Sequence, residues 1–119
     1  MSILITFAET VVSATLDNNP TANDFRSLLP LEVTLEDHAG TEKITYLPRK
    51  LSIAGAPDGV TPVAGDLAYY APWGNLAIFY RDFRYSPGLI RLGRITSPLE
   101  ALRFNGKAQA RIAIAKARP

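Results

Sequence analysis

The chain has 119 residues, long enough for one buried core and too short to divide into two, so we expect a single domain over residues 1–119. Its 13 Lys and Arg residues face 11 Asp and Glu residues, and this net charge of +2 does not imply a nucleic-acid partner. The sequence contains no cysteine, which excludes disulfides and thiolate chemistry.

The amino-terminal stretch resembles neither an export signal nor a membrane span. It has no positively charged beginning and no long apolar run, because Glu9 interrupts it. We therefore expect a cytoplasmic protein with no membrane partner.

Positive charge gathers toward the carboxyl end. One acid, Glu100, stands there among seven basic residues: Arg91, Arg94, Arg103, Lys107, Arg111, Lys116 and Arg118. Solvated positions on strands and tail explain this excess better than a nucleic-acid or other anionic partner.

The first third of the chain predicts a hairpin followed by a short helix. Residues 3–7 and 11–16 alternate between apolar and other positions, which is typical of two strands. Asn19 and Pro20 are favoured residues for a helix start. The apolar stripe that would lie on the sheet, and the proline that would end the helix, are Ala22, Phe25, Leu28, Leu29 and Pro30.

Two more strands are expected on either side of a turn at residues 37–40. Val33 and Leu35 alternate with polar residues, and Ile44 and Tyr46 continue with period two after the turn. Pro48 indicates a strand end and places Arg49 near a rim. Residues 53–65 then form a long loop rich in glycine and proline, and such loops are often functional.

Residues 65–80 are the segment around which the fold is expected to organise. Two aromatic-rich runs flank a Pro-Trp-Gly-Asn corner, which predicts a hairpin. Tyr69, Ile78 and Tyr80 are expected in the core together with Tyr46. Other aromatic residues are placed on the opposite strand faces or at the corner, where a barrel can turn them toward a cleft: Tyr70, Phe79 and Trp73.

The last third predicts one bulged strand, a second short helix and a closing strand. Ile90, Leu92 and Ile95 all point inward if the strand bulges at Gly93. Residues 97–100 match a capping box that would start a helix. Residues 110–115 alternate again and can pair with the first strand. The expected fold is mainly β: a small closed antiparallel barrel with two short helices.

Three segments, in chain order, resemble the cyclophilin fold, and in particular the compact bacterial cyclophilin-like family. Residues 11–16 with the run Asn19-Pro20-Thr21-Ala22-Asn23-Asp24-Phe25 resemble its second strand and first helix. Residues 65–68 and 74–79 resemble the paired strands that line the cyclophilin proline pocket. Residues 89–95, followed by a short helix, resemble a later strand of the family. The resemblance covers nearly the whole chain.

The resemblance implies peptidyl-prolyl cis-trans isomerisation, in which an arginine holds the carbonyl while amide resonance is weakened. Arg49 best matches the family's catalytic arginine; the alternative is a rim arginine paired with a carboxylate such as Glu42. The family's strand glutamine and second pocket phenylalanine positions hold Leu76 and Ile78 here. These departures place isomerase activity second among the expected functions.

A binding module is the first expectation, with a peptide or small molecule in an apolar cleft beside an arginine. The candidate ligand-binding residues are Arg49, Tyr70, Trp73, Phe79 and Tyr85. A structural or oligomer-forming domain is the third expectation, and the oligomeric state stays open. No cofactor and no metal are expected, because His38 has no second histidine or cysteine to complete a metal set.

Overall fold

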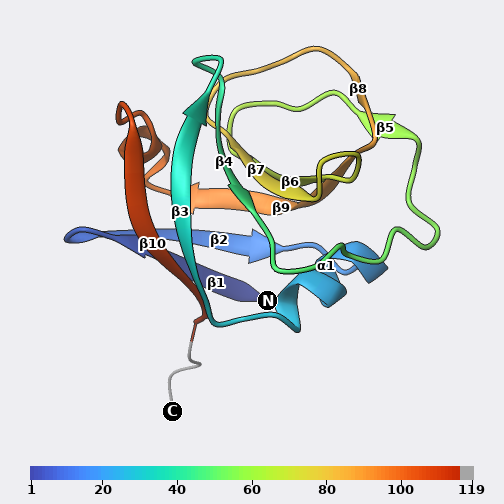
Figure 1. Cartoon of the computed structure of the whole chain (residues 1–119), viewed down its shortest axis with the longest axis horizontal. Helices are drawn as coiled ribbons and strands as arrows, with labels where there is room; N and C mark the ends of the chain where they lie inside the picture. Colours follow the sequence, from blue (N-terminus) through green and yellow to red (C-terminus); the bar gives the residue numbers. More distant parts are fainter. Residues whose placement is uncertain (116–119) are drawn as a thin grey trace.

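Eight antiparallel strands close into a barrel in the order β1-β10-β3-β4-β7-β6-β9-β2 (Figure 1). The computed structural model describes residues 1–115. The barrel strands are β1 Ser2–Phe7, β2 Thr10–Leu16, β3 Leu31–His38, β4 Glu42–Tyr46, β6 Asp66–Tyr70, β7 Asn75–Phe79, β9 Leu89–Ser97 and β10 Lys107–Ile114. The predicted closed barrel is confirmed.

The pairing of the last strand with the first closes the barrel, as the sequence predicts. Ile5 of β1 lies opposite Ile112 of β10 on one side and Val12 of β2 on the other. All three side chains are fully buried in the barrel core. Successive side chains of a strand point to opposite faces of the sheet, so the apolar positions of these three strands face the core.

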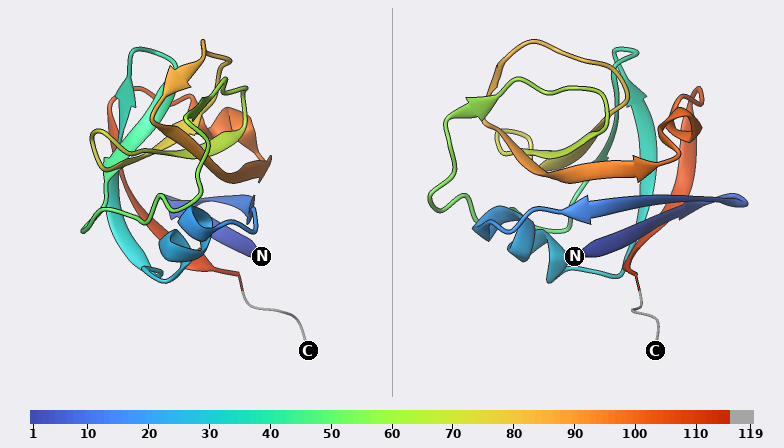
Figure 2. Two further views of the ribbon diagram at one scale, coloured as in Figure 1. Left: turned by 90° about the vertical axis from the view of Figure 1, so that its right-hand side faces the viewer. Right: turned by 180° about the vertical axis from the view of Figure 1, so that it is seen from behind.

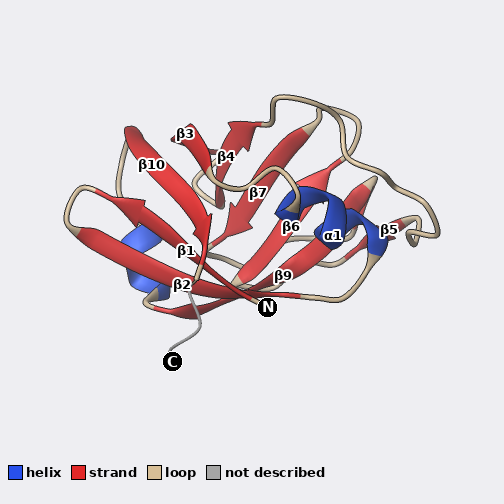
Figure 3. Cartoon of the chain, turned by 90° about the horizontal axis from the view of Figure 1, so that it is seen from below, coloured by secondary structure: helices blue, strands red, loops and turns tan. Residues whose placement is uncertain are grey.

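The two helical segments lie at opposite ends of the barrel (Figures 1 and 3). Helix α1, Pro20–Arg26, begins as predicted: the Asn19 side chain accepts a hydrogen bond of 2.8 Å from the Ala22 amide. The second segment, η1 Leu99–Leu102, is a 3₁₀ helix without the predicted capping box, because the residue before it is Pro98, which has no side-chain acceptor.

No helix within residues 1–115 is long and apolar enough to cross a membrane.

Strand β9 has the irregularity that the sequence predicts near Gly93. Its register against β6 shifts between Leu67 and Ala68, which pair with Gly93 and Arg91. The shift lets Ile90, Leu92 and Ile95 all join the barrel core. The bulged strand also brings Gly93 against the backbone of β2.

The faces of β4 differ from the prediction. Tyr46 was expected in the core but is 58% exposed, and Ile44 faces outward beneath a covering loop. Lys43 instead points into the barrel and is fully buried, with an ion pair to Asp37 at 3.0 Å. The period-two alternation therefore predicts the strand correctly but assigns its faces the wrong way round. The face that carries Lys43 is the one that points into the barrel.

A second apolar layer covers the outside of β4, β6, β7 and β9. Its buried members are Ile44, Ala68, Ala77, Phe79 and Leu89. The loop that follows β7 arches over them, and its β8 segment (Ser86–Pro87) pairs with β5 (Gly59–Val60) in a separate small sheet (Figure 2). The barrel wall in this region is consequently buried on both faces.

Acidic partners offset much of the positive charge near the carboxyl end. Four of its basic residues pair across strands or loops: Arg91 with Asp17, Arg94 with Asp66, Lys107 with Glu36, and Arg111 with Glu32. Lys116 and Arg118 lie outside the described residues.

Candidate functional site

A cavity of about 310 Å³ lies on the outer wall of the barrel, between the sheet and the loop that follows β7. We refer to it as the outer-wall cavity. Strands β4, β6, β7 and β9 supply its floor, while the turns after β3 and β6 and the loop of residues 80–88 supply its rim. Its lining residues are His38, Ala39, Thr41, Glu42, Ile44, Tyr70, Trp73, Asn75, Ala77, Phe79, Phe83, Arg84, Tyr85, Ser86, Pro87 and Leu89.

Aromatic side chains form two walls of the cavity. Tyr70 and His38 both pack edge-on against Trp73, with ring centroids at 5.4 and 5.7 Å. On the other side the rings of Phe79 and Phe83 stack at 6.4 Å. Such pairs hold the rings in fixed positions around a mostly apolar space.

The structure brings four of the five sequence-predicted ligand-binding residues together. Tyr70, Trp73, Phe79 and Tyr85 all line the outer-wall cavity. Tyr70 and Phe79 reach it because odd and even positions of a strand face opposite sides: Tyr69 and Ile78 point into the core.

Arg49 lies elsewhere, which corrects the expectation of a cleft beside it. It lines neither the outer-wall cavity nor a second cavity of about 210 Å³ next to α1. Its guanidinium makes a bidentate pair with the Asp24 carboxylate of α1, with nitrogen–oxygen distances of 2.8 and 3.0 Å. Asp24 also accepts a hydrogen bond of 2.7 Å from the Ser52 amide, so this cluster fastens the loop after β4 to the helix.

The Asp24 cluster predicts a stability difference that depends on pH. The hydrogen bonds from Arg49 and the Ser52 amide lower the pKa of Asp24 from 3.8 to about 2. A depressed pKa stabilises the fold above the unfolded value, and that contribution is lost as pH falls through the folded value. We expect Asp24→Asn to melt below the wild type at pH 5–7 and the two to converge near pH 2, as measured by thermal unfolding. Melting curves that stay equally far apart at pH 2 would contradict this role.

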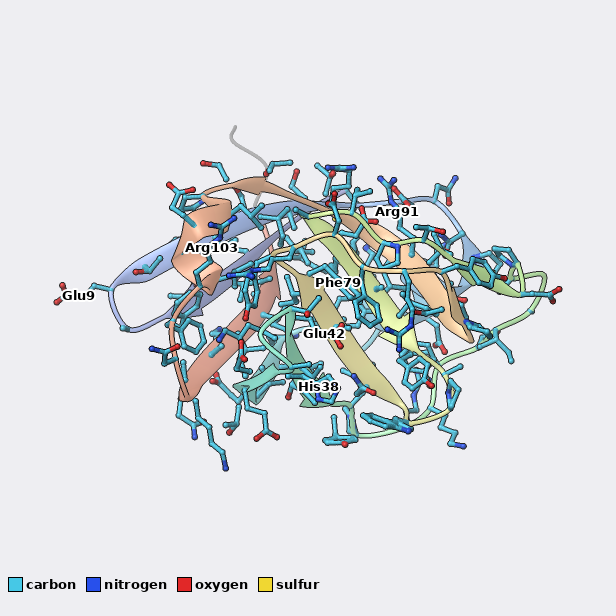
Figure 4. The ribbon with its side chains drawn as sticks, turned by 90° about the horizontal axis from the view of Figure 1, so that it is seen from above. Glu9, His38, Glu42, Phe79, Arg91 and Arg103 are labelled. Atoms are coloured by element: carbon cyan, nitrogen blue, oxygen red, sulfur yellow. The ribbon has the colours of Figure 1, made fainter. Side chains whose placement is uncertain are left out.

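Glu42 is the one carboxylate among the residues that line the outer-wall cavity. Figure 4 shows it on β4 with Phe79 and His38 on either side, and the strand register agrees, since Glu42 lies opposite both. Within residues 1–115 its side chain makes no ion pair and no hydrogen bond. Burial first, and then the nearby charge of Asp37, raise the pKa of Glu42 to about 7.

The raised pKa of Glu42 predicts that Glu42→Gln stabilises the protein only at neutral and higher pH. The wild-type contribution is present below pH 4.5 and is lost as pH rises through about 7, because the ionised form is poorly solvated. Since Glu42 is partly exposed, we discount the full shift and expect a gain of about 1–2 kcal/mol at pH 8.5. Thermal unfolding at pH 4 and pH 8.5 measures it; an equal gain at both values would contradict the assignment.

Asn75 contributes a second unusual polar group to the cavity lining. The residue is 2% exposed, and its side-chain nitrogen donates to the Leu76 carbonyl at 3.1 Å. Its side-chain oxygen is buried without a hydrogen-bond partner. Buried polar atoms are nearly always paired, so this unpaired acceptor is unusual among the lining residues.

A family model described as the cyclophilin-like family matches residues 5–113. The chain belongs to the cyclophilin-like family. This cyclophilin-like protein is also similar to the solution structure of a hypothetical protein from Archaeoglobus fulgidus, with a TM-score of 0.71 and 17% identity over 97% of this chain and 95% of that chain. A likeness at this identity shows the fold alone. No curated protein matches the chain.

Four residues that line the cavity of this cyclophilin-like protein are not among the predicted site residues: Glu42, Asn75, Phe83 and Arg84. The sequence suggests Glu42 only as a partner of Arg49, and Asn75 only as part of the corner between two strands. The available signal was register: Glu42 shares its strand face with Ile44, and Asn75 shares one with Phe79.

Among residues 1–115 no group of three or more His, Asp or Glu side chains could hold a metal ion.

Proposed function

We propose that this cyclophilin-like protein binds a small molecule or a single peptide side chain in the outer-wall cavity. The observation that supports the proposal most is the convergence of Tyr70, Trp73, Phe79 and Tyr85 on one cavity of about 310 Å³. That volume is at the lower end of the range for ligand pockets, so it suits a ligand built around one ring.

The lining has the composition of a binding site. Ile44, Ala77 and Leu89 give an apolar floor, and the aromatic walls leave only a few polar groups to orient a guest. Apolar surface supplies affinity in such sites, while isolated polar groups supply specificity. The proposal thus keeps the cleft expected from the sequence and replaces Arg49 with other polar groups.

A test of the proposal uses Trp73, the only tryptophan of the chain, as the reporter. Titration with a library of single-ring fragments should change its fluorescence for a subset of them. Tyr70→Ala should weaken those fragments about tenfold, because Tyr70 packs on Trp73 inside the cavity. Tyr46→Ala is the matched control, because Tyr46 is an exposed tyrosine that does not line the cavity. Equal losses in the two variants, or no responding fragment, would count against the proposal.

Prolyl isomerisation is the second candidate function, and Arg84 is the observation that favours it. Arg84 lines the outer-wall cavity, where its guanidinium lies 4.6 Å from the Phe83 ring centroid. A cation above an apolar seat is what weakening of amide resonance requires. An exchange assay on a proline peptide should then show acceleration that Arg84→Ala removes and Arg49→Ala keeps. Acceleration that Arg49→Ala removes and Arg84→Ala keeps would instead restore Arg49 as the candidate catalytic residue.

Two further expectations from the sequence stay predictions. The oligomer-forming alternative predicts a sedimentation coefficient that rises with concentration and falls back in Trp73→Ala, a residue that is half exposed. The cytoplasmic location can be checked by fractionation of cells that produce the protein.

A further inference from the structure

The floor of the outer-wall cavity places a carboxylate between two aromatic walls. Glu42 lies opposite His38 on one neighbouring strand and opposite Phe79 on the other. Trp73 packs against His38, and Phe83 stacks on Phe79 (Figure 4 labels the three central residues). A cation is attracted by the carboxylate and also by aromatic ring faces.

Two of the unpartnered polar groups among the lining residues are acceptors. The Glu42 carboxylate has no ion pair within the described part of the chain, and the Asn75 side-chain oxygen has no hydrogen-bond partner. Glu42 lies opposite Phe79, which is four positions after Asn75 on β7, so the two acceptors lie roughly 13 Å apart along the strand direction. A ligand that pairs with the Glu42 carboxylate must bring N–H or O–H donors.

The basic groups close to Glu42 do not neutralise it. Lys43 directly follows Glu42 on β4, but its side chain points to the other side of the sheet, into the barrel, where it pairs with Asp37. Arg84 is exposed on the rim and rests over the Phe83 ring. The negative charge of Glu42 is therefore available to a ligand.

From this arrangement we propose that the outer-wall cavity selects an aromatic or otherwise apolar amine or amidine, with its cationic nitrogen against the Glu42 carboxylate. The inference rests on the proposed binding function and names its ligand class. Ionised Glu42 is needed for the contact, so binding should depend on pH. The charged and titratable groups around it are Asp37, His38, Tyr70, Arg84 and Tyr85.

Three planar probes of nearly equal shape test the inference: benzamidine, a cation; benzamide, its neutral analogue; and benzoate, an anion. Emission from Trp73, at the cavity wall, reports binding. At pH 8.5 benzamidine should bind about tenfold more tightly than benzamide, and benzoate should bind most weakly. At pH 5.5 the preference for benzamidine should largely vanish, because Glu42 is then mostly protonated, its pKa being about 7.

Glu42→Gln should reduce benzamidine binding at pH 8.5 to the level of benzamide while benzamide binding is unchanged. Glu9→Gln is the matched control, because Glu9 lies at the tip of the first hairpin, away from the cavity (Figure 4). Equal binding of benzamidine and benzamide, or a preference that survives Glu42→Gln, would overturn the inference and leave the proposed cavity binding intact. If no probe alters Trp73 emission while other fragments do, the inference also fails. If nothing alters it, both proposals fail.

Discussion

Asp37→Ala is expected to lower the free energy of unfolding by about 3–5 kcal/mol, the largest loss that we predict for a single side chain. Lys43 is fully buried inside the barrel, and its ammonium pairs with Asp37 at 3.0 Å. The Tyr80 hydroxyl donates to the same carboxylate. Burial would raise the pKa of Asp37, yet the hydrogen bonds from Tyr80 and Lys43 outweigh it and lower the pKa. The substitution leaves a buried cation without its counter-charge.

Chemical denaturation measures this loss, and a double variant separates its cause. Lys43 also donates to the Phe104 carbonyl, and its ammonium nitrogen lies 4.0 Å from the Phe104 ring centroid, so the fully buried side chain ends against an aromatic ring. Lys43→Met combined with Asp37→Ala removes both charges and should recover part of the stability that Asp37→Ala alone loses. A double variant no more stable than Asp37→Ala would show that the cost does not come from the unpaired ammonium.

Gly93→Ala is expected to cost about 3 kcal/mol and to lower the melting temperature by roughly 10 °C. A Cβ at this position would overlap the Thr15 carbonyl oxygen and lie 2.9 Å from its carbonyl carbon. Both atoms belong to the backbone of β2, which cannot move without breaking its pairing with β9. The close approach of β2 to the bulged strand β9 therefore requires glycine at position 93.

Gly55→Ala is the control for that substitution. Gly55 has a φ of +69° but no heavy atom within 4 Å of an added Cβ, so it tests backbone strain without a steric clash. We expect a cost of about 1 kcal/mol, clearly less than for Gly93→Ala. Gly93 has no positive φ, so equal costs in thermal unfolding would mean that β2 shifts to admit the added Cβ, and would contradict the expected clash.

Local patterns predicted the strands of the barrel because each strand shows its own alternation of apolar and polar residues. Alternation in residues 3–16 and 110–115 fixed the strands that close the sheet, and Gly93 marked the bulge. The outward positions of Tyr70 and Phe79 follow from the same period of two. The second helix lacks the predicted cap because Ser97 belongs to β9, and the helical segment begins at Leu99.

Long-range contacts explain what local patterns missed. The partner of Arg49 is Asp24, 25 residues earlier in the chain, and nothing near Pro48 indicates that the loop folds back to the helix. The predicted faces of β4 are wrong because a covering loop buries the outer face of the strand, where the apolar side chain of Ile44 lies. An ion pair with the partly exposed Asp37 meanwhile lets the buried Lys43 face the core.

A map of backbone amide shifts during titration with a single-ring fragment tests the central claim most directly, namely that the outer-wall cavity is the binding site. The account predicts that the largest shifts fall on Glu42, Asn75, Ala77, Phe79 and the loop of residues 80–88. Shifts that gather instead around Arg49 and Asp24, with those residues unchanged, would contradict it.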